Sequence, residues 1–224
     1  KGRCDKEWRD SDSPFFVAGL SGGQLLKLEV GGITTLDGLA KLPVGTKIAG
    51  IGSEPLTRLT AQARMQMSAR ESGVHATELL PVAKGRGFCL LPPPDRGDLY
   101  FDMEGDPLYE GGLEYLFGIW GNLGDGGADE FVPIWAHDRK QEKDAFEQLM
   151  RLFTAHLSRH PEAHIYHYAQ YEPTALKRLA MCHATMEAEL DQMLRDRRFV
   201  DLYRVVRQGL RASTEGYSLK DLEK

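Results

Sequence analysis

Cysteine is scarce in this sequence of 224 residues, which contains only Cys4, Cys89 and Cys182. Three widely separated cysteines argue against a framework of disulfide bonds and for a reducing compartment, so we expect a cytoplasmic location. Cys89 lies in the apolar stretch GFCLLP and is expected in the core. Cys4 is either an ordinary residue or the ligand of a metal or cluster whose other ligands lie further upstream.

Long apolar runs are also absent. No stretch of about 18 apolar residues occurs, so the sequence predicts no membrane-spanning helix. The first residues, KGRCDKEW, contain neither an initiator methionine nor the apolar stretch of a signal peptide, and we expect a segment of a longer polypeptide. The composition, 42% hydrophobic and 27% charged, is typical of a globular protein, and the length allows one sizeable domain with or without a small appendage.

An excess of positive charge is lacking as well, since the formal net charge is -5 at pH 7. This excludes a protein that holds nucleic acid by a general positive field, but it does not exclude a local basic track. Arg204, Arg207 and Arg211 recur at spacings of three and four residues, which would align them on one helical face. That face either contacts phosphates or is a solvated surface that balances nearby acids.

Residues 1–84 are expected to form a helical region. An apolar helix ends at Gly31 and Gly32, and Thr34 is the expected N-cap of a second short helix. Two helices joined by a tight glycine turn resemble the helix-hairpin-helix modules of DNA-handling proteins, in which backbone N–H groups face a phosphate. Any two packed helices with a glycine turn give a similar pattern, so DNA contact and simple packing both stay open. A further amphipathic helix is expected over residues 55–72.

A proline-bounded linker separates this region from a second domain, expected over residues 95–224, in which the apolar period becomes strand-like. Three strands in succession favour an antiparallel meander, and a helix followed by a fourth strand favours a crossover that places this strand parallel to the first. The expected elements are strands at residues 98–104, 114–123, 130–137 and 163–169, with a helix at 139–161. We therefore expect an α/β mixed sheet, three antiparallel strands plus a parallel fourth with flanking helices, which resembles the ribonuclease H-like fold.

The first expected strand carries two acids inside an apolar run, LYFDMEGDPL at residues 99–108. Side chains alternate along a strand, so Asp102 and Glu104 project from the same face. Two neighbouring carboxylates form either a metal site or an acid pair at an exposed strand end, because burying like charges requires a cation or hydrogen-bond donors. Glu172 follows the fourth strand at the start of a helix, or is simply a first-turn carboxylate. The convergence of three acids favours the metal site.

These stretches resemble the motifs of a known superfamily. YFDMEGDP resembles the first motif of the DEDD exonucleases, HYAQYEPTALKRL resembles the second, and FVDLYRVVRQGL with GYSLKDLEK resembles the segment before the third. The combination is most similar to the ribonuclease H-like domain of predicted RecB-family nucleases. CDKEWRDSDSPFFVAGLS and GITTLDGLAKL are similar to the segment that joins this domain to their upstream nuclease. The resemblance covers nearly the whole chain.

The resemblance implies a metal-dependent nuclease, specifically a 3′–5′ exonuclease acting on DNA. It implies two Mg²⁺ or Mn²⁺ ions held by carboxylates, because hard cations prefer oxygen ligands. Asp102 would bridge both ions, Glu104 would hold the ion on the side of the attacking water, and Glu172 would support the other. The domain would belong to a larger DNA-processing protein that has an upstream nuclease and, in some relatives, a downstream helicase.

Contacts to nucleic acid are expected from the positions of the residues themselves, whereas a role for Cys4 is implied by the resemblance. Tyr171 would pack against a nucleotide, and the basic track of Arg204, Arg207 and Arg211 would guide the strand. His167 and Tyr168 are treated as structural. Cys4 would match the last of several clustered cysteines, which implies an iron–sulfur cluster in the full-length protein.

Two departures from the family pattern keep a second hypothesis open. The second motif usually carries an aspartate where this chain has Glu172, and the third motif, an acid preceded by a Tyr or His base, is not found before Lys224. The chain would then hold three of four acids, its second domain would be incomplete, and it could be inactive alone. Asp201 lies in the intermediate segment and is given at most a supporting role. The alternative is a catalytically degenerate module that binds nucleic acid or links nuclease and helicase domains.

Overall fold

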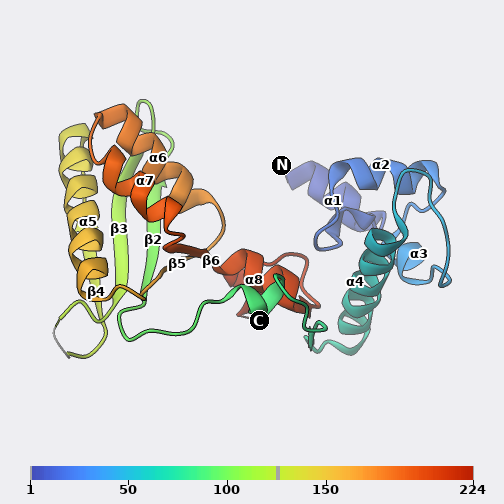
Figure 1. The fold of residues 1–224 in the computed structure, drawn as a ribbon. Helices are drawn as coiled ribbons and strands as arrows, with labels where there is room; N and C mark the ends of the chain where they lie inside the picture. The colour runs from blue at the N-terminus through green and yellow to red at the C-terminus, as the bar shows by residue number, and fades with distance from the viewer. Residues whose placement is uncertain (1, 125–126, 224) are drawn as a thin grey trace. The chain divides into compact units, whose positions relative to one another are not determined.

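The computed structural model describes residues 2–124 and 127–223, with side chains from residue 5 onward within these ranges. The chain forms two compact units, one of residues 2–82 with 206–223 and one of residues 83–205 (Figure 1). The expected domains, 1–84 and 95–224, stay a prediction. The structure differs from them at the C-terminal side, because residues 206–223 pack with the N-terminal helices instead of the sheet.

The helical unit contains one long helix, α4 (Ser53–Ser72), and several shorter ones. Its core is formed by leucine side chains, among which Leu28, Leu36, Leu39 and Leu59 are fully buried. The other elements are α1 (Gly2–Asp10), η1 (Pro14–Phe16), α2 (Gly22–Val30), α3 (Leu36–Ala40), β1 (Thr77–Leu79), β7 (Leu210–Ala212) and α9 (Leu219–Leu222). The helix α8 (Leu202–Gly209) contains residues of both units.

The expected pair of helices with a glycine turn is present as α2 and α3. Gly32 adopts a φ of 80°, a left-handed conformation that glycine reaches at little cost, just after the end of α2. The N-cap of α3 is Thr35, whose Oγ1 accepts a hydrogen bond from Gly38 N at 3.0 Å. The expected cap, Thr34, is therefore wrong by one residue. DNA contact at this turn stays a prediction.

Arg204, Arg207 and Arg211 do not share one helical face, so this expectation is wrong. α8 ends at Gly209, and Arg211 lies on β7, where it pairs with Glu78 of the antiparallel strand β1. Arg211 Nη1 lies 2.6 Å from Glu78 Oε2. These two residues are 133 positions apart in the sequence, and such a long-range strand pairing overrides the local helical spacing.

The second unit contains a mixed sheet of five strands in the order β4-β3-β2-β5-β6. β2 (Leu99–Asp106), β3 (Leu113–Gly121) and β4 (Glu130–Trp135) form an antiparallel meander, and β5 (Ile165–His167) pairs parallel with β2. The expected mixed sheet is thus confirmed. The fifth strand, β6 (Phe199–Asp201), pairs parallel with β5 and was not expected, because three residues are too few to show an alternating pattern.

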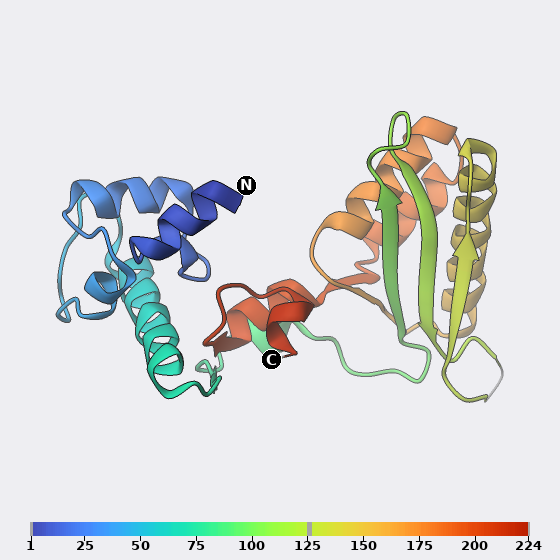
Figure 2. The ribbon, with the colours of Figure 1, turned by 180° about the vertical axis from the view of Figure 1, so that it is seen from behind.

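Three helices pack on one face of this sheet: α5 (Arg139–Arg159), α6 (Tyr171–His183) and α7 (Glu187–Arg195) (Figures 1 and 2). The fully buried side chains of Phe117, Phe146 and Phe153 fill the space between the strands and the helices. The short η2 (Gly87–Leu90) precedes β2. Burying one sheet face in this way leaves every second residue of β2 on the opposite face.

That opposite face is not covered by any described helix of this unit, as Figure 2 shows. Aromatic rings lie on it in register: Tyr100 of β2 pairs with Trp120 of β3, and Trp120 pairs with Phe131 of β4. These three rings and Trp135 are each about half exposed. Tyr100 also stacks on Tyr166 of β5, with ring centroids 5.4 Å apart. The same sheet face carries the acid pair of β2.

Two remaining expectations concern cysteines and membranes. Cys89 is exposed, so its placement in the core is wrong: the short η2 turn buries Gly87 and leaves the thiol outside. The side chain of Cys4 lies outside the described residues. Within the described ranges, no helix is long and apolar enough to cross a membrane.

Candidate active site

The acid pair projects from the middle of β2. Phe101 and Met103 point into the core, so Asp102 and Glu104 point to the uncovered face, as strand alternation predicts. The pairing of β2 with β3 shifts register between Glu104 and Gly105. A Cβ at Gly105 would clash with Tyr171 Oη and would lie 2.6 Å from Glu114 Oε2, so glycine at this bulge leaves room for the ends of these two side chains.

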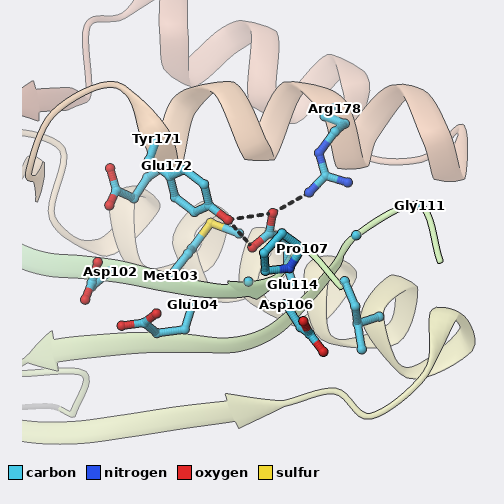
Figure 3. Close-up of a pocket in the computed structure, with 13 residues that line it drawn as sticks. Asp102, Met103, Glu104, Asp106, Pro107, Gly111, Glu114, Tyr171, Glu172 and Arg178 are labelled. Atoms are coloured by element: carbon cyan, nitrogen blue, oxygen red, sulfur yellow. Dashed lines mark hydrogen bonds and ion pairs between the residues drawn. The ribbon is translucent and has the colours of Figure 1, made fainter. Parts of the chain in front are cut away.

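Glu172 reaches the same place from the first turn of α6. Because β5 lies beside β2 and runs parallel to it, the segment after β5 returns to the sheet edge near the acids. Figure 3 shows the carboxylates of Asp102, Glu104 and Glu172 at one end of the pocket. All three line a single open pocket of about 670 Å³. The expected convergence of three acids is therefore present in the fold.

The turn before α6 is held by Asp201, at the end of β6. Ala169 has a φ of 73°, a conformation that is strained for a residue with a Cβ. Asp201 Oδ1 accepts a hydrogen bond from Ala169 N at 3.1 Å, and Oδ2 accepts one from Gln170 Nε2 at 2.9 Å. These bonds fix the start of α6 and with it the position of Glu172. Asp201 thus supports the site without lining the acid pocket.

Burial and like charges dominate the electrostatics of the three acids. The pKa of Asp102 is raised, first by burial, then by the charge of Glu172 and a hydrogen bond with it, and then by the charge of Glu104. The Glu172 side chain is only 3% exposed, and its Oε2 has no hydrogen-bond partner among the described residues. The nearest cationic candidate is His167, whose Nδ1 lies 3.3 Å away. A group of carboxylates in this state would be stabilised by an added cation.

A second polar cluster occupies the other end of the pocket. Tyr171 Oη donates to Glu114 Oε2 at 2.8 Å, and Arg178 forms an ion pair with the same carboxylate (Figure 3). Burial, the hydrogen bond and the charge of Glu114 raise the pKa of Tyr171 to about 12, so the phenol stays protonated and donates. The Tyr171 ring remains about half exposed at the pocket. The hydroxyl thus fixes the orientation of an accessible aromatic ring.

Glu114 and Arg178 were not identified from the sequence. Tyr171 and Arg178 are seven residues apart, two turns along α6, and this spacing is a usable signal that they share a face. Glu114 follows a pair of glycines at the start of β3, and nothing in its local pattern distinguishes it from a surface acid. Its burial comes from the tertiary packing of β3 against α6.

The structure does not gather the predicted basic track at this pocket. Arg204 lies at the start of α8 and lines a different pocket of the sheet-containing unit. Arg207 and Arg211 belong to the helical unit and line a small pocket there. Of the predicted nucleic-acid contacts, only Tyr171 lies beside the acids. The roles assigned to these residues stay predictions.

The donor set of the pocket fits a hard divalent cation. Carboxylate oxygens are the ligands that Mg²⁺ and Mn²⁺ prefer, and the orphaned Oε2 of buried Glu172 is available for one. As the side chains stand, however, no group of three or more His, Cys, Asp or Glu within the described ranges is arranged to hold a metal ion. Binding would therefore require at least one of these acids to rotate toward a common point.

The mixed sheet, the helices on one face and the acids on β2 and α6 define a ribonuclease H-like domain. A family model described as the RNase_H superfamily matches residues 99–224, which is more than half of the chain. The chain therefore belongs to the RNase H superfamily. No curated protein and no solved structure matches it. Membership in this superfamily indicates a nuclease-type function and a nucleic-acid substrate.

Proposed function

We propose that this chain is a metal-dependent nuclease domain that hydrolyses phosphodiester bonds, acting as a 3′–5′ exonuclease on DNA. The observation that carries the proposal is the convergence of Asp102, Glu104 and Glu172 on one pocket from β2 and α6. Like charges gathered at one point are costly, and they are retained where a cation or a reacting group offsets the repulsion.

Asp102, Glu104 and Glu172 would hold Mg²⁺ or Mn²⁺ through their oxygens, with two ions in the active form. When bound, such ions activate water and stabilise the leaving oxygen in phosphodiester hydrolysis. Asp102, between the other two acids, would serve both ion positions. His167, buried against Glu172, would hold that carboxylate in place from behind.

Tyr171 would position the nucleotide next to the acids. Its hydroxyl is tied to Glu114, and Glu114 is tied to Arg178, so the ring has little freedom to turn away. A fixed, half-exposed ring is suited to stack on a base of any identity. We also propose that the domain acts inside a larger DNA-processing protein, beside an upstream nuclease and a downstream helicase domain as in RecB-family relatives. An iron–sulfur cluster that includes Cys4 belongs to the same hypothesis.

A second candidate function is a catalytically degenerate module that binds nucleic acid or links neighbouring domains. The observation that favours it is the absence of a three-residue metal arrangement among the described residues. In such a module, a proton on Asp102, whose pKa is raised by burial and by its acidic neighbours, would take the place of the cation.

A calorimetric titration with Mn²⁺ distinguishes these two functions. We expect the native protein to bind Mn²⁺ and Asp102→Asn to bind it about tenfold more weakly or not at all, because a charged ligand is lost. Asp144→Asn is the matched control: it makes the same change at an exposed carboxylate of α5, outside the acid pocket. Its Mn²⁺ affinity should be unchanged. Absence of binding in all three proteins would favour the degenerate module.

A cleavage assay then tests polarity and substrate. We expect a single strand of DNA labelled at its 5′ end to be shortened progressively in Mn²⁺ by the native protein and by Asp144→Asn. Asp102→Asn should leave it intact. Cleavage at internal positions, or shortening only of RNA, would contradict the proposed exonuclease activity on DNA.

A further inference from the structure

A second pocket, of about 570 Å³, opens on the other side of the first turn of α6. Gln170 and Pro173 line this pocket, whereas Tyr171 and Glu172, between them in sequence, line the acid pocket. The two pockets therefore adjoin each other across one helical turn. The remaining walls come from the ends of β5 and β6, the start of α8 and the segment around Leu91.

The second pocket is lined by three cationic side chains, Lys177, Arg197 and Arg204. They come from α6, from the turn before β6 and from α8. Within the residues that the structure describes, none of the three side chains has an ion pair or a hydrogen-bond acceptor. The side chains of all three are exposed to solvent and are free to meet an anion.

The single acid among the lining residues does not neutralise these cations. Asp201 uses Oδ1 to accept hydrogen bonds from the backbone of Ala169 at 3.1 Å and Arg204 at 3.2 Å, and uses Oδ2 for Gln170. Both carboxylate oxygens of Asp201 therefore already accept hydrogen bonds, from the turn before α6 and from the start of α8. The pocket has three cationic side chains and one acid, so it is positive, although the net charge of the chain is negative.

Two histidines add polar atoms to the wall of the pocket. His167, at the end of β5, is 4% exposed, and His164, three residues earlier and just before β5, is partly buried; both line the pocket. The Nδ1 atom of each has no hydrogen-bond partner among the described residues. The two arginines and the lysine carry the positive charge of the pocket.

We propose that this cationic pocket, defined by Lys177, Arg197 and Arg204, binds backbone phosphates of the nucleic-acid strand whose scissile bond lies at the acids. The inference rests on the proposed function for the identity of the strand. Guanidinium groups bind phosphate oxygens in a forked geometry, and lysine binds them as a point charge. The two neighbouring pockets suit a single nucleic-acid strand: the acid pocket would hold the phosphodiester that is cleaved, and the cationic pocket would bind neighbouring phosphates of the same strand.

The test is a binding measurement without divalent ions, so that it does not depend on the acid pocket. A fluorescein-labelled single strand of twelve deoxythymidines is titrated with protein in EDTA, and fluorescence anisotropy gives Kd at several salt concentrations. We expect the double variant Lys177→Gln/Arg204→Gln to raise Kd about tenfold. We also expect it to flatten the slope of log K against log salt by about 1–1.5, the loss of two phosphate contacts.

The matched control is Arg96→Gln/Lys140→Gln, which removes one arginine and one lysine at exposed positions of the same unit, outside both pockets. It should leave Kd within about twofold, since general electrostatics alone change little at moderate salt. Equal losses in the two double variants would overturn the proposal. If the first double variant does not fold, Lys177→Gln alone takes its place, with an expected loss of about threefold.

Competition separates a strand from a free phosphate. A pocket that binds several linked phosphates should prefer the strand to a single phosphate. Inorganic phosphate and thymidine monophosphate should therefore displace the labelled strand only at concentrations far above that of the strand. A variant that loses affinity for inorganic phosphate while it keeps affinity for the strand would overturn the proposal in favour of a small-anion site. Failure of Mn²⁺ binding with intact strand binding would count against the nuclease and leave the cationic pocket standing.

Discussion

At the residue scale, the carboxylates of the acid pocket are stabilised little by the groups around them. Glu172 is buried with one orphaned oxygen, and the raised pKa of Asp102 reflects burial and two acidic neighbours. Hydrophobic burial elsewhere in the sheet must offset this cost, because among the described residues only His167 lies within ion-pair distance of Glu172, at 3.3 Å. A stability cost concentrated on a few side chains is typical of a functional site.

Tyr171 allows the ring and the hydroxyl to be tested separately. Tyr171→Phe keeps the ring and removes the donor to Glu114, so we expect about 1 kcal/mol of lost stability and an oligonucleotide Kd within about twofold of native. Tyr171→Ala removes the stacking surface as well, and we expect Kd to rise by about five- to fiftyfold. Urea unfolding and fluorescence anisotropy measure the two effects. A Phe variant as weak in binding as the Ala variant would show that the hydroxyl, not the ring, contacts the strand.

The residues that the sequence could predict are those set by local alternation. Asp102 and Glu104 follow from strand periodicity, and Glu172 follows from its place after the neighbouring strand. Glu114 and Arg178 could not be predicted, because their pairing depends on how α6 lies across β3. The metal, nucleotide and strand-guiding roles of all these residues stay predictions.

At the scale of single elements, α5 is tied to the sheet by a buried acid. Glu142, only 1% exposed, accepts a hydrogen bond from Glu114 N at 2.7 Å, and it pairs with Arg139 at 2.9 Å and His183 at 3.0 Å. One carboxylate thus joins the start of α5, the start of β3 and the end of α6. These contacts of Glu142 fix the start of β3, which carries Glu114.

Replacing this acid should loosen all three elements together. We expect Glu142→Ala to lower the free energy of unfolding by about 3 kcal/mol, because it leaves a buried backbone donor, Arg139 and His183 without their acceptor. Asp144→Ala, at an exposed position of the same helix, is the control and should change stability by less than about 0.5 kcal/mol. Denaturant unfolding provides both values, and similar losses in the two variants would contradict a special role for Glu142.

A second contact of α5 gives the protein a stability that depends on pH. His156 is fully buried, and its Nε2 lies 2.7 Å from Gly97 O, just before β2. Burial lowers the pKa of His156 below its ordinary value of 6.5; the bond to Gly97 opposes this, and the nearby charges of His160 and Arg159 add to it. The unfolded chain therefore binds a proton at a pH where the folded chain does not.

The sign of the effect follows from this difference in proton binding. The contribution of His156 is complete above about pH 6.5 and is lost as the pH falls from there toward the folded pKa. We expect the urea midpoint of the native protein to drop more steeply between about pH 7 and 5.5 than that of His156→Gln. His137→Gln, at an exposed histidine, should keep the native slope. Identical slopes in all three proteins would rule out His156 as the source.

The elements themselves were predictable where they are long. The meander β2–β4, the 21-residue helix α5 and the parallel β5 follow from their apolar periods. The short β6 and α7 were not predicted, and α8 was predicted to run past its end at Gly209. Short segments carry too few residues to show a period, and their conformation is decided by the partner they pair with.

At the scale of the whole molecule, one unit is built from two separate stretches of the chain, residues 2–82 and 206–223, and the residues between them form the other unit. The segment 206–223 returns to the N-terminal helices, where β7 pairs with β1 and Tyr217 donates to Gln62 Oε1 at 3.1 Å. Pairing across such a separation requires closure of a long loop, which local sequence patterns do not encode. The linker proline run predicts a change of architecture, but it carries no signal for the unit that residues 206–223 join.

The uncovered sheet face gives the protein an optical signal of its own. Trp120 of β3 and Trp135 of β4 are half exposed on the sheet face that carries Asp102 and Glu104, at positions opposite Tyr100 of β2 and Leu116 of β3. Indole emission responds to polarity and to stacking, so we expect a single-stranded oligonucleotide that binds at the acids to quench it without any attached dye. Trp8→Phe should keep the response, and Trp120→Phe/Trp135→Phe should abolish it. A response that survives the double replacement would place the bound strand away from this face.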